Sequence, residues 1–157
     1  MRHALSTATR SLAMLTLTSL AACGTTAPDP SGPVSIAIAQ ALTGQTSSAG
    51  TFIVTGARAD SGSTTEEITF GGPLTASPVP LTFVRRLTGA AGTLTITGSA
   101  SLAFTSPSAA TLTGNWIVQS GTGVYINTTG SGAITGTADF GATPPTGTLV
   151  YTGRLDR

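Results

Sequence analysis

Apolar and polar residues alternate along much of the chain with a period of two. The clearest run spans residues 93–104, whose polar side is almost entirely Thr and Ser. Its apolar side carries Leu94, Ile96, Ala100, Leu102 and Phe104. A period of two places successive side chains on opposite faces of a β-strand, and Gly98 within the run indicates a bend or bulge. An apolar face opposite a polar face is typical of an antiparallel sheet with one side in water.

The same alternation predicts further strands on both sides of this run. They cover residues 34–42, 51–60, 65–70, 81–87, 110–119 and 148–155. Turns rich in Gly, Ser and Thr are predicted at residues 43–50 and 61–63, and the prolines within residues 71–80 are expected to interrupt the sheet. The first strand also fits a short helix, but β-branched residues at its start favour the strand.

Residues 115–136 carry the strongest turn signals. Gly121 and Gly123 predict a tight hairpin after the run that contains Trp116. The chain is then expected to continue as a strand, a glycine turn and a third strand, at residues 124–126, 130–132 and from 133 onward. These predicted elements form a β-meander.

The number and spacing of these elements predict the fold class. About eight short strands, with no amphipathic helix between them, predict an all-β domain. We expect an antiparallel β-barrel of about eight strands, with a β-sandwich as the alternative. Glycines inside the strands favour a small barrel, because its strands must bend sharply.

The N-terminus reads as a targeting signal. A short basic start precedes an apolar run over residues 12–20 that is too short to span a bilayer permanently. The run ends in Leu20-Ala21-Ala22-Cys23, which resembles a bacterial lipobox, so Cys23 is expected to be acylated and to become the new N-terminus. The alternative is an ordinary secretory signal cleaved after Ala22, with Cys23 left as a free thiol.

This signal divides the chain into three parts. Residues 1–22 are the predicted signal peptide, residues 23–33 the lipidated cysteine with a Pro- and Gly-rich tether, and residues 34–157 one β-barrel domain. The protein is therefore expected in the bacterial cell envelope, held to a membrane by its lipid and facing the periplasm or the cell exterior.

Composition limits the chemistry of the mature chain. The full chain has seven Arg, no Lys and six acidic residues, and removal of the signal leaves five Arg. A near-neutral chain without a basic stripe argues against a nucleic-acid partner. The only His and both Met lie in the signal, so a His base, a Schiff-base Lys and a His- or Cys-ligated zinc are excluded. We therefore predict no catalytic residues, no metal site and no cofactor.

Two segments resemble a known family. Residues 51–62, TFIVTGARADSG, are similar to an opening motif "G-T-F-x-x-x-G-x-x-x-D-x-G" of bacterial secreted proteins, and residues 116–132 to their signature "W-x-I-x-S-G-T-G-x-Y-x-x-x-x-G-x-G". Those proteins resemble the allene oxide cyclase and dirigent barrel superfamily. The resemblance covers most of residues 50–155, although the Pro-rich segment 73–80 departs from it. It implies an eight-stranded barrel, often trimeric, with an apolar cavity, and it carries over no catalytic residue.

Two groups of side chains are candidates for a ligand pocket. The charged candidates share the apolar face of their strands and are Arg58, Asp60, Glu66 and Arg85. They are expected to form either a polar patch in or near a cavity, or structural ion pairs and strand-end charges. The aromatic candidates, either pocket or core, are Trp116, Tyr125 and Tyr151.

Two functions remain open on these grounds. One is a non-enzymatic lipoprotein of the cell envelope, either structural or binding a small apolar ligand. The alternative is an isomerase similar to allene oxide cyclase, acting on an apolar oxidised lipid, with Glu66 or Asp60 as the carboxylate. A cavity with a carboxylate inside favours the isomerase, and a filled interior favours the first function.

Overall fold

Eight β-strands follow one another in the part of the chain that the computed structural model describes, residues 31–157. They are β1 (Gly32–Leu42), β2 (Ser47–Gly56), β3 (Asp60–Phe70), β4 (Val79–Gly89), β5 (Gly92–Phe104), β6 (Ala109–Gly121), β7 (Thr129–Asp139) and β8 (Thr146–Asp156). A short 3₁₀ helix, η1 (Gly123–Tyr125), lies between β6 and β7. The predicted signal peptide and Cys23 lie outside the described residues.

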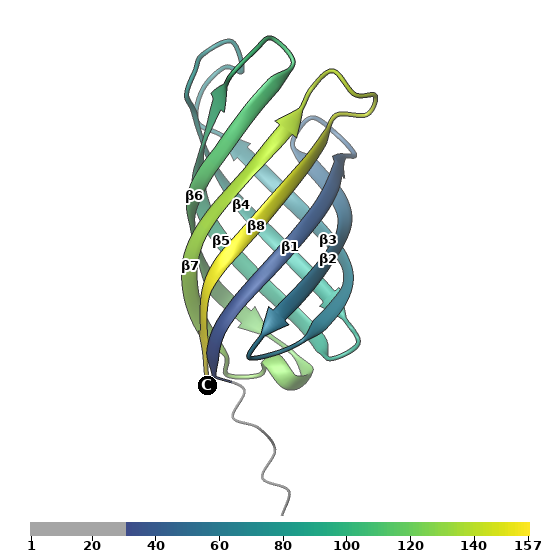
Figure 1. The fold of residues 1–157 in the computed structure, drawn as a ribbon, viewed down its shortest axis with the longest axis vertical. Coiled ribbons are helices and arrows are strands. Elements are labelled where there is room, and N and C mark those ends of the chain that lie inside the picture. The colour runs from purple at the N-terminus through teal and green to yellow at the C-terminus, as the bar shows by residue number, and fades with distance from the viewer. Residues whose placement is uncertain (1–30) are drawn as a thin grey trace, which may run out of the picture.

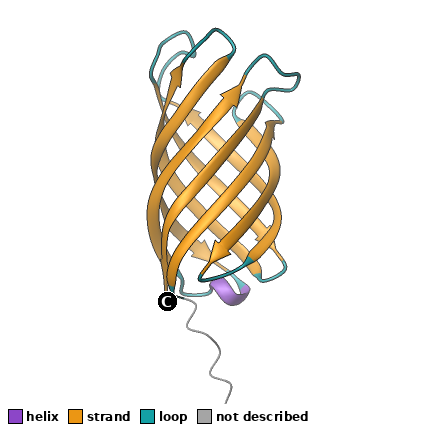
Figure 2. Cartoon of the chain, viewed as in Figure 1, coloured by secondary structure: helices purple, strands orange, loops and turns teal. Residues whose placement is uncertain are grey.

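The strands close into a barrel. Each strand pairs antiparallel with the next one along the chain, and β8 pairs back with β1 (Figure 1). Closure leaves no free sheet edge, so no row of backbone groups goes unpaired. The predicted all-β antiparallel barrel of eight strands is confirmed (Figure 2). The alternative of a β-sandwich is wrong, because all strands belong to one closed sheet.

The period of two in the sequence divides side chains between the barrel interior and water. On β4, the inward positions are buried and the residues between them are exposed. These inward positions are Val79, Leu81, Phe83, Arg85 and Leu87. The apolar faces predicted on β5, β6 and β8 also pack into the core. Most outward positions are Thr or Ser, which suit a water-facing strand surface.

The two ends of the barrel differ (Figure 1). One end carries the first and last described residues, and the η1 segment lies across it, with the Tyr125 side chain 2% exposed. We call this the tether end. The opposite, far end carries the loops that follow β1, β3, β5 and β7. Within residues 31–157, no helix has the length and apolar character needed to cross a membrane.

The turn between β2 and β3 lies earlier than predicted. The expected turn at residues 61–63 is wrong, because these residues lie inside β3. β2 ends at Gly56, whose φ of 100° is a glycine conformation, and the chain reverses just after it. Arg58 therefore lies in the turn, and Asp60 begins β3 instead of ending the strand predicted over 51–60.

The predicted β-meander is wrong in its middle part. Residues 124–126 are not a strand but η1 and the residue after it. Gly123 has φ of 61° and Asn127 φ of 59°, and these left-handed conformations bend the chain across the barrel end.

Several glycines that the sequence pattern assigns to turns or bulges lie inside strands. Their role there is to allow close packing with neighbouring side chains. Gly130 and Gly132 lie within β7, and a Cβ on Gly132 would lie 2.7 Å from Nε1 of Trp116. A Cβ on Gly98 would similarly lie 2.7 Å from the Phe83 ring. The register irregularity of the β5–β6 pair falls at Thr95 and Ile96 instead of at Gly98.

Other strand boundaries extend beyond the predicted ones. β1 begins at Gly32, inside the predicted tether over residues 23–33, and β2 begins at Ser47, inside the predicted turn at 43–50. The strand predicted over 65–70 begins at Asp60. Small residues occupy these extensions, and they carry little of the apolar signal from which strands are predicted.

Candidate functional site

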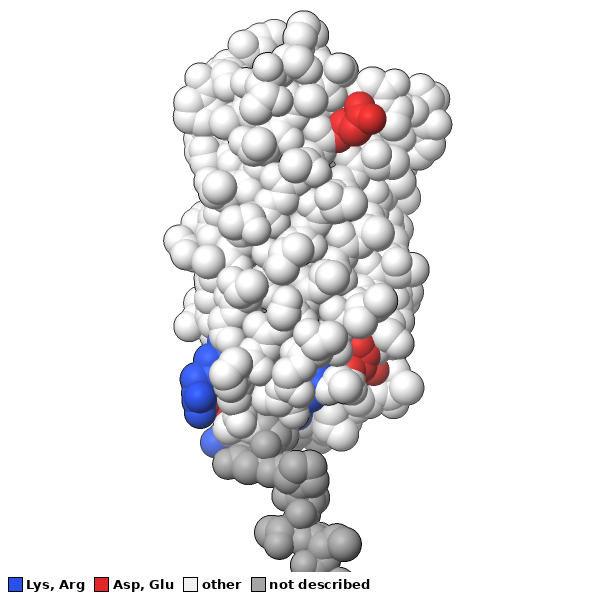
Figure 3. Space-filling view, viewed as in Figure 1, with Lys and Arg blue, Asp and Glu red and all other residues white. Residues whose placement is uncertain are grey.

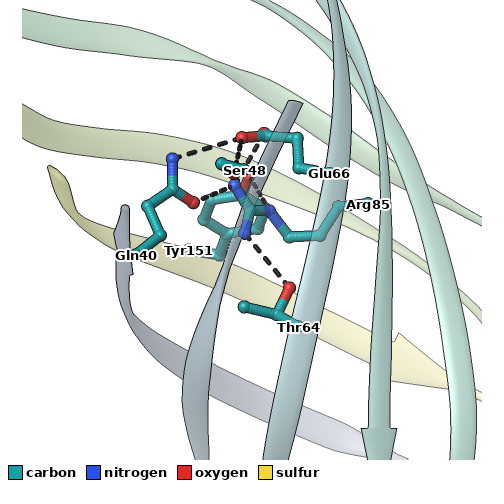
Figure 4. Close-up of polar contacts among 6 residues, drawn as sticks. All are labelled: Gln40, Ser48, Thr64, Glu66, Arg85 and Tyr151. Carbon is teal, nitrogen blue, oxygen red and sulfur yellow. Dashed lines mark hydrogen bonds and ion pairs between the residues drawn. The ribbon is translucent and has the colours of Figure 1, made fainter. Parts of the chain in front are cut away.

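Arg85 is fully buried inside the barrel, and its guanidinium group is the centre of a polar network (Figure 4). Nη2 lies 2.6 Å from Oε1 of Glu66 and donates to Oε1 of Gln40, also at 2.6 Å. Nη1 donates to the Thr64 hydroxyl at 3.2 Å, and Nε donates to the Tyr151 hydroxyl at 3.0 Å. A buried charge is costly unless it is paired, and this one is paired and hydrogen-bonded.

The Glu66 carboxylate is equally well satisfied. Its second oxygen accepts hydrogen bonds from Ser48 at 3.0 Å and from the Gln40 amide at 3.2 Å. Strand register produces this arrangement, because Glu66 stands opposite Ser48 on β2 and opposite Arg85 on β4. Neighbouring strands therefore bring the polar side chains to one level of the barrel.

Aromatic rings pack against this network. The ring of Tyr151 stacks on Trp116 at 6.3 Å between ring centres, and Cζ of Arg85 lies 5.6 Å from the centre of the Tyr151 ring. Burial raises the pKa of the Tyr151 hydroxyl to about 12, although the Arg85 charge acts in the opposite direction. Tyr151 is therefore protonated at neutral pH and can donate a hydrogen bond.

A cavity of about 70 Å³ lies between this network and the far end. Gln40, Glu66 and Tyr151 line it on the network side, and we call them its floor. Its wall is mainly apolar and includes Ile68, Phe70, Leu81, Leu102, Leu112 and Leu149. Phe140 and Pro145 belong to the far-end loop between β7 and β8, so the cavity extends to the rim of the barrel.

A second cluster closes the tether end. Arg58 is 7% exposed, donates from Nη1 to the backbone oxygen of Val124, and has its Cζ 5.5 Å from the centre of the Tyr125 ring. The Tyr125 hydroxyl donates to Asp60 at 2.9 Å. Burial raises the pKa of Tyr125 well above its usual value, and the bond to Asp60 raises it further. These contacts hold η1 across the barrel end.

The structure thus places the candidate pocket residues in two separate groups. The central group consists of Glu66, Arg85, Tyr151 and Trp116. The tether-end group consists of Arg58, Asp60 and Tyr125. They do not form one polar patch. Only Glu66 and Tyr151 line the far-end cavity, and Glu66 with Arg85 forms a buried ion pair.

Three polar residues of the network are absent from the sequence-based candidates: Gln40, Ser48 and Thr64. The period of two places all three on the inward faces of their strands, although it does not show that they meet there. Gln40 continues the inward face of Ile36 and Ile38, and Ser48 continues that of Phe52. Ser48 is missed because it lies in the predicted turn at residues 43–50. Thr64 is missed because it lies just before the strand predicted over residues 65–70.

No group of His, Cys, Asp and Glu side chains suited to holding a metal ion occurs in the described part of the chain.

Comparisons with protein-family models, with curated proteins and with solved structures find no match to the chain. The candidate function therefore rests on the geometry of the barrel and on the sequence motifs.

Proposed function

We propose that this protein is a lipid-anchored β-barrel of the bacterial cell envelope that binds a small, uncharged, largely apolar ligand without transforming it. The far-end cavity is the observation that carries the proposal. An apolar wall that ends on a few polar groups is typical of small-molecule sites. The lipobox-like Leu20–Cys23 motif supports the anchor.

The size of the cavity limits the ligand. At about 70 Å³ it is well below the roughly 300–1,000 Å³ of sites that enclose drug-sized molecules. It still exceeds the roughly 10–15 Å³ that one water needs on a comparable measure. A very small molecule, or the end of a narrow chain that enters from the rim, fits these limits.

The floor favours a hydrogen-bond acceptor on the ligand. The Tyr151 oxygen accepts from Arg85, so its own proton is directed to another acceptor. Tyr151 also lines the cavity, so this proton can be directed to a ligand there. A carbonyl, ether or hydroxyl oxygen of a ligand would fill this role.

The charges of the floor favour an uncharged ligand. Arg85 and Glu66 neutralise each other at 2.6 Å, so the floor offers no unbalanced charge to an ion. Bringing a carboxylate or ammonium group into an apolar cavity without a counter-charge is costly. A short ketone, ester or alcohol satisfies both the apolar wall and the floor.

Glu66 lines the cavity and so meets the condition given above for the isomerase, but its contacts favour binding over isomerisation. A catalytic carboxylate must reach a substrate proton, whereas Glu66 is ion-paired and accepts two further hydrogen bonds. Asp60, the other candidate carboxylate, belongs to the tether-end cluster instead of the cavity.

The trimer implied by the family resemblance stays a prediction, which light scattering of the purified protein would test.

Binding of heptanone to the full-length lipoprotein in lipid nanodiscs tests the proposal. Ala138 lines the cavity on β7, and Thr135 faces outward on the same strand. We expect Ala138→Trp to weaken heptanone binding at least about tenfold by filling the cavity, and Thr135→Trp to leave it unchanged. Calorimetry with subtraction of empty nanodiscs measures both. Equal binding by wild type and Ala138→Trp would overturn the proposed site.

A further inference from the structure

The segment between β6 and β7 presents apolar side chains to solvent at the tether end. Val124 is 48% exposed and Ile126 49% exposed, on either side of the buried Tyr125. Hydrogen bonds hold the segment in place, with Val124 N donating to Ala91 O at 3.0 Å and the Tyr125 hydroxyl donating to Asp60. The two apolar side chains are therefore held outward by a braced loop. We call Val124 and Ile126 the tip.

Charge is also distributed unequally between the two ends. The four far-end loops, residues 43–46, 71–78, 105–108 and 140–145, contain no charged residue. Exposed arginines lie instead toward the tether end: Arg86 near the end of β4, Arg154 opposite Pro33, and Arg157 at the last position. Arg154 is paired there with Asp156 at 2.6 Å, so Arg86 and Arg157 carry most of the basic charge of this end. Figure 3 shows basic side chains on the visible face only near this end, where acidic side chains lie beside them.

The reach of the chain sets which end lies near an anchored lipid. Eight residue steps separate Cys23 from Ser31, and they span at most about 29 Å when fully extended. The longest strands have 13 residues, which at the usual rise and tilt of barrel strands gives a barrel height of about 30 Å. A lipid on Cys23 therefore holds the tether end within about 29 Å of the bilayer, whereas the far end lies about one barrel height further along the molecule.

We propose that the tip rests in the headgroup region of an anionic bilayer, with the nearby arginines facing the lipid phosphates. This inference rests on the lipid anchor of the proposed function. Apolar side chains at the interface and basic side chains beside anionic lipids both favour such contact. The contact orients the barrel so that the far-end cavity opens away from the membrane.

A fluorescent label on the lipidated protein tests this orientation. Cys23 is the only cysteine of the chain, so a second cysteine provides the only free thiol when Cys23 is acylated. Ile126→Cys places an environment-sensitive label at the tip. Leu74→Cys, at a similarly exposed apolar residue of the far end, is the matched control. Both full-length proteins are incorporated into vesicles of phosphatidylglycerol and phosphatidylethanolamine.

We expect the Ile126 label to shift its emission to shorter wavelength and to be quenched by spin-labelled lipid at least about threefold more than the Leu74 label. Replacing the phosphatidylglycerol with phosphatidylcholine should reduce that difference. Equal quenching of both labels, or a tip shift that depends on protein density instead of lipid, would overturn the proposal. Flotation with the vesicles and the mass of the N-terminal peptide report the anchor separately, so loss of anchoring is distinguished from an anchored protein whose tip stays in water.

Discussion

Arg85 and Glu66 face each other across neighbouring strands inside the barrel, with Nη2 of the arginine 2.6 Å from Oε1 of the glutamate. The pair separates a packed half of the interior, toward the tether end, from the half that contains the cavity. Both partners also bond to Gln40, which joins β1 to the pair. The polar network is thus at once a structural tie between strands and the floor of the candidate ligand site.

Breaking this ion pair should lower the stability of the fold. Arg85→Met leaves the Glu66 carboxylate buried without its counter-charge, and we expect a loss of about 3–5 kcal/mol in the free energy of unfolding. Arg154→Met is the control, because its pair with Asp156 is largely exposed and should be worth about 1 kcal/mol or less. Denaturant titration measures both. The double variant Arg85→Met/Glu66→Met should recover most of the loss, and an Arg85→Met protein as stable as the control would contradict this account of the pair.

The tyrosines give a pH dependence whose sign is defined. Tyr125 and Tyr151 are the only tyrosines, and burial raises the pKa of both, that of Tyr151 to about 12. The unfolded chain ionises near pH 10, so it releases protons that the folded chain retains. The stability contributed by the neutral hydroxyls is therefore present below about pH 10 and is lost as the pH rises toward 12.

Near-ultraviolet absorbance of tyrosinate measures the ionisation of Tyr125 and Tyr151 directly. We expect no tyrosinate from the folded protein around pH 10, and its appearance together with unfolding at higher pH. Tyr151→Phe should reduce the fall in stability over this range. Ionisation near pH 10 with the fold intact would mean that one of these hydroxyls is accessible to water.

Gly132 should tolerate no side chain. A Cβ there would press on the Trp116 indole and on the Thr152 backbone, so Gly132→Ala is expected to cost about 1–3 kcal/mol. Gly72 has open space around it, and Gly72→Ala should be neutral or stabilise by up to about 1 kcal/mol. Thermal unfolding followed by the fluorescence of Trp116, the only tryptophan, compares the two. Similar melting temperatures for both variants would show that β7 does not press on the indole.

Cys23 should determine membrane attachment. With Cys23→Ser the chain loses the thiol that the lipid requires, and we expect it to leave the membrane fraction of its host. The measurement is the distribution of the protein between membrane and soluble fractions after a high-salt wash. A variant that stays in the membrane fraction would refute the lipobox interpretation.

The fold class follows from the sequence because burial imposes a period of two on each strand. On β4 and β5 the buried residues alternate with exposed ones, and this is the signal that the apolar pattern records. Several of the errors fall where glycine has a second role. Gly62 and Gly132 mark close packing between strands instead of turns, and composition alone does not separate the two roles.

The candidate site is only partly predictable, because the sequence shows its charged residues but not the strand register that brings the others to them. Arg85 and Glu66 stand out because charges on an apolar face are unusual, whereas Gln40 and Ser48 are ordinary residues at strand ends. Their contact with Glu66 depends on the register of β1, β2 and β3. Register sets which strand positions lie at one level, and alternation within one strand contains no record of it.

Methyl NMR of the full-length protein in nanodiscs tests the central claim most directly, namely that the far-end half of the barrel binds a small uncharged ligand. Leu102 and Leu112 line the cavity, while Leu94 and Leu155 are core leucines outside its lining. We predict that heptanone shifts the first two methyl signals and leaves the other two unchanged, and that heptanoate has little effect. Unshifted Leu102 and Leu112 signals at saturating heptanone, or equal shifts from heptanone and heptanoate, would contradict the proposed ligand site.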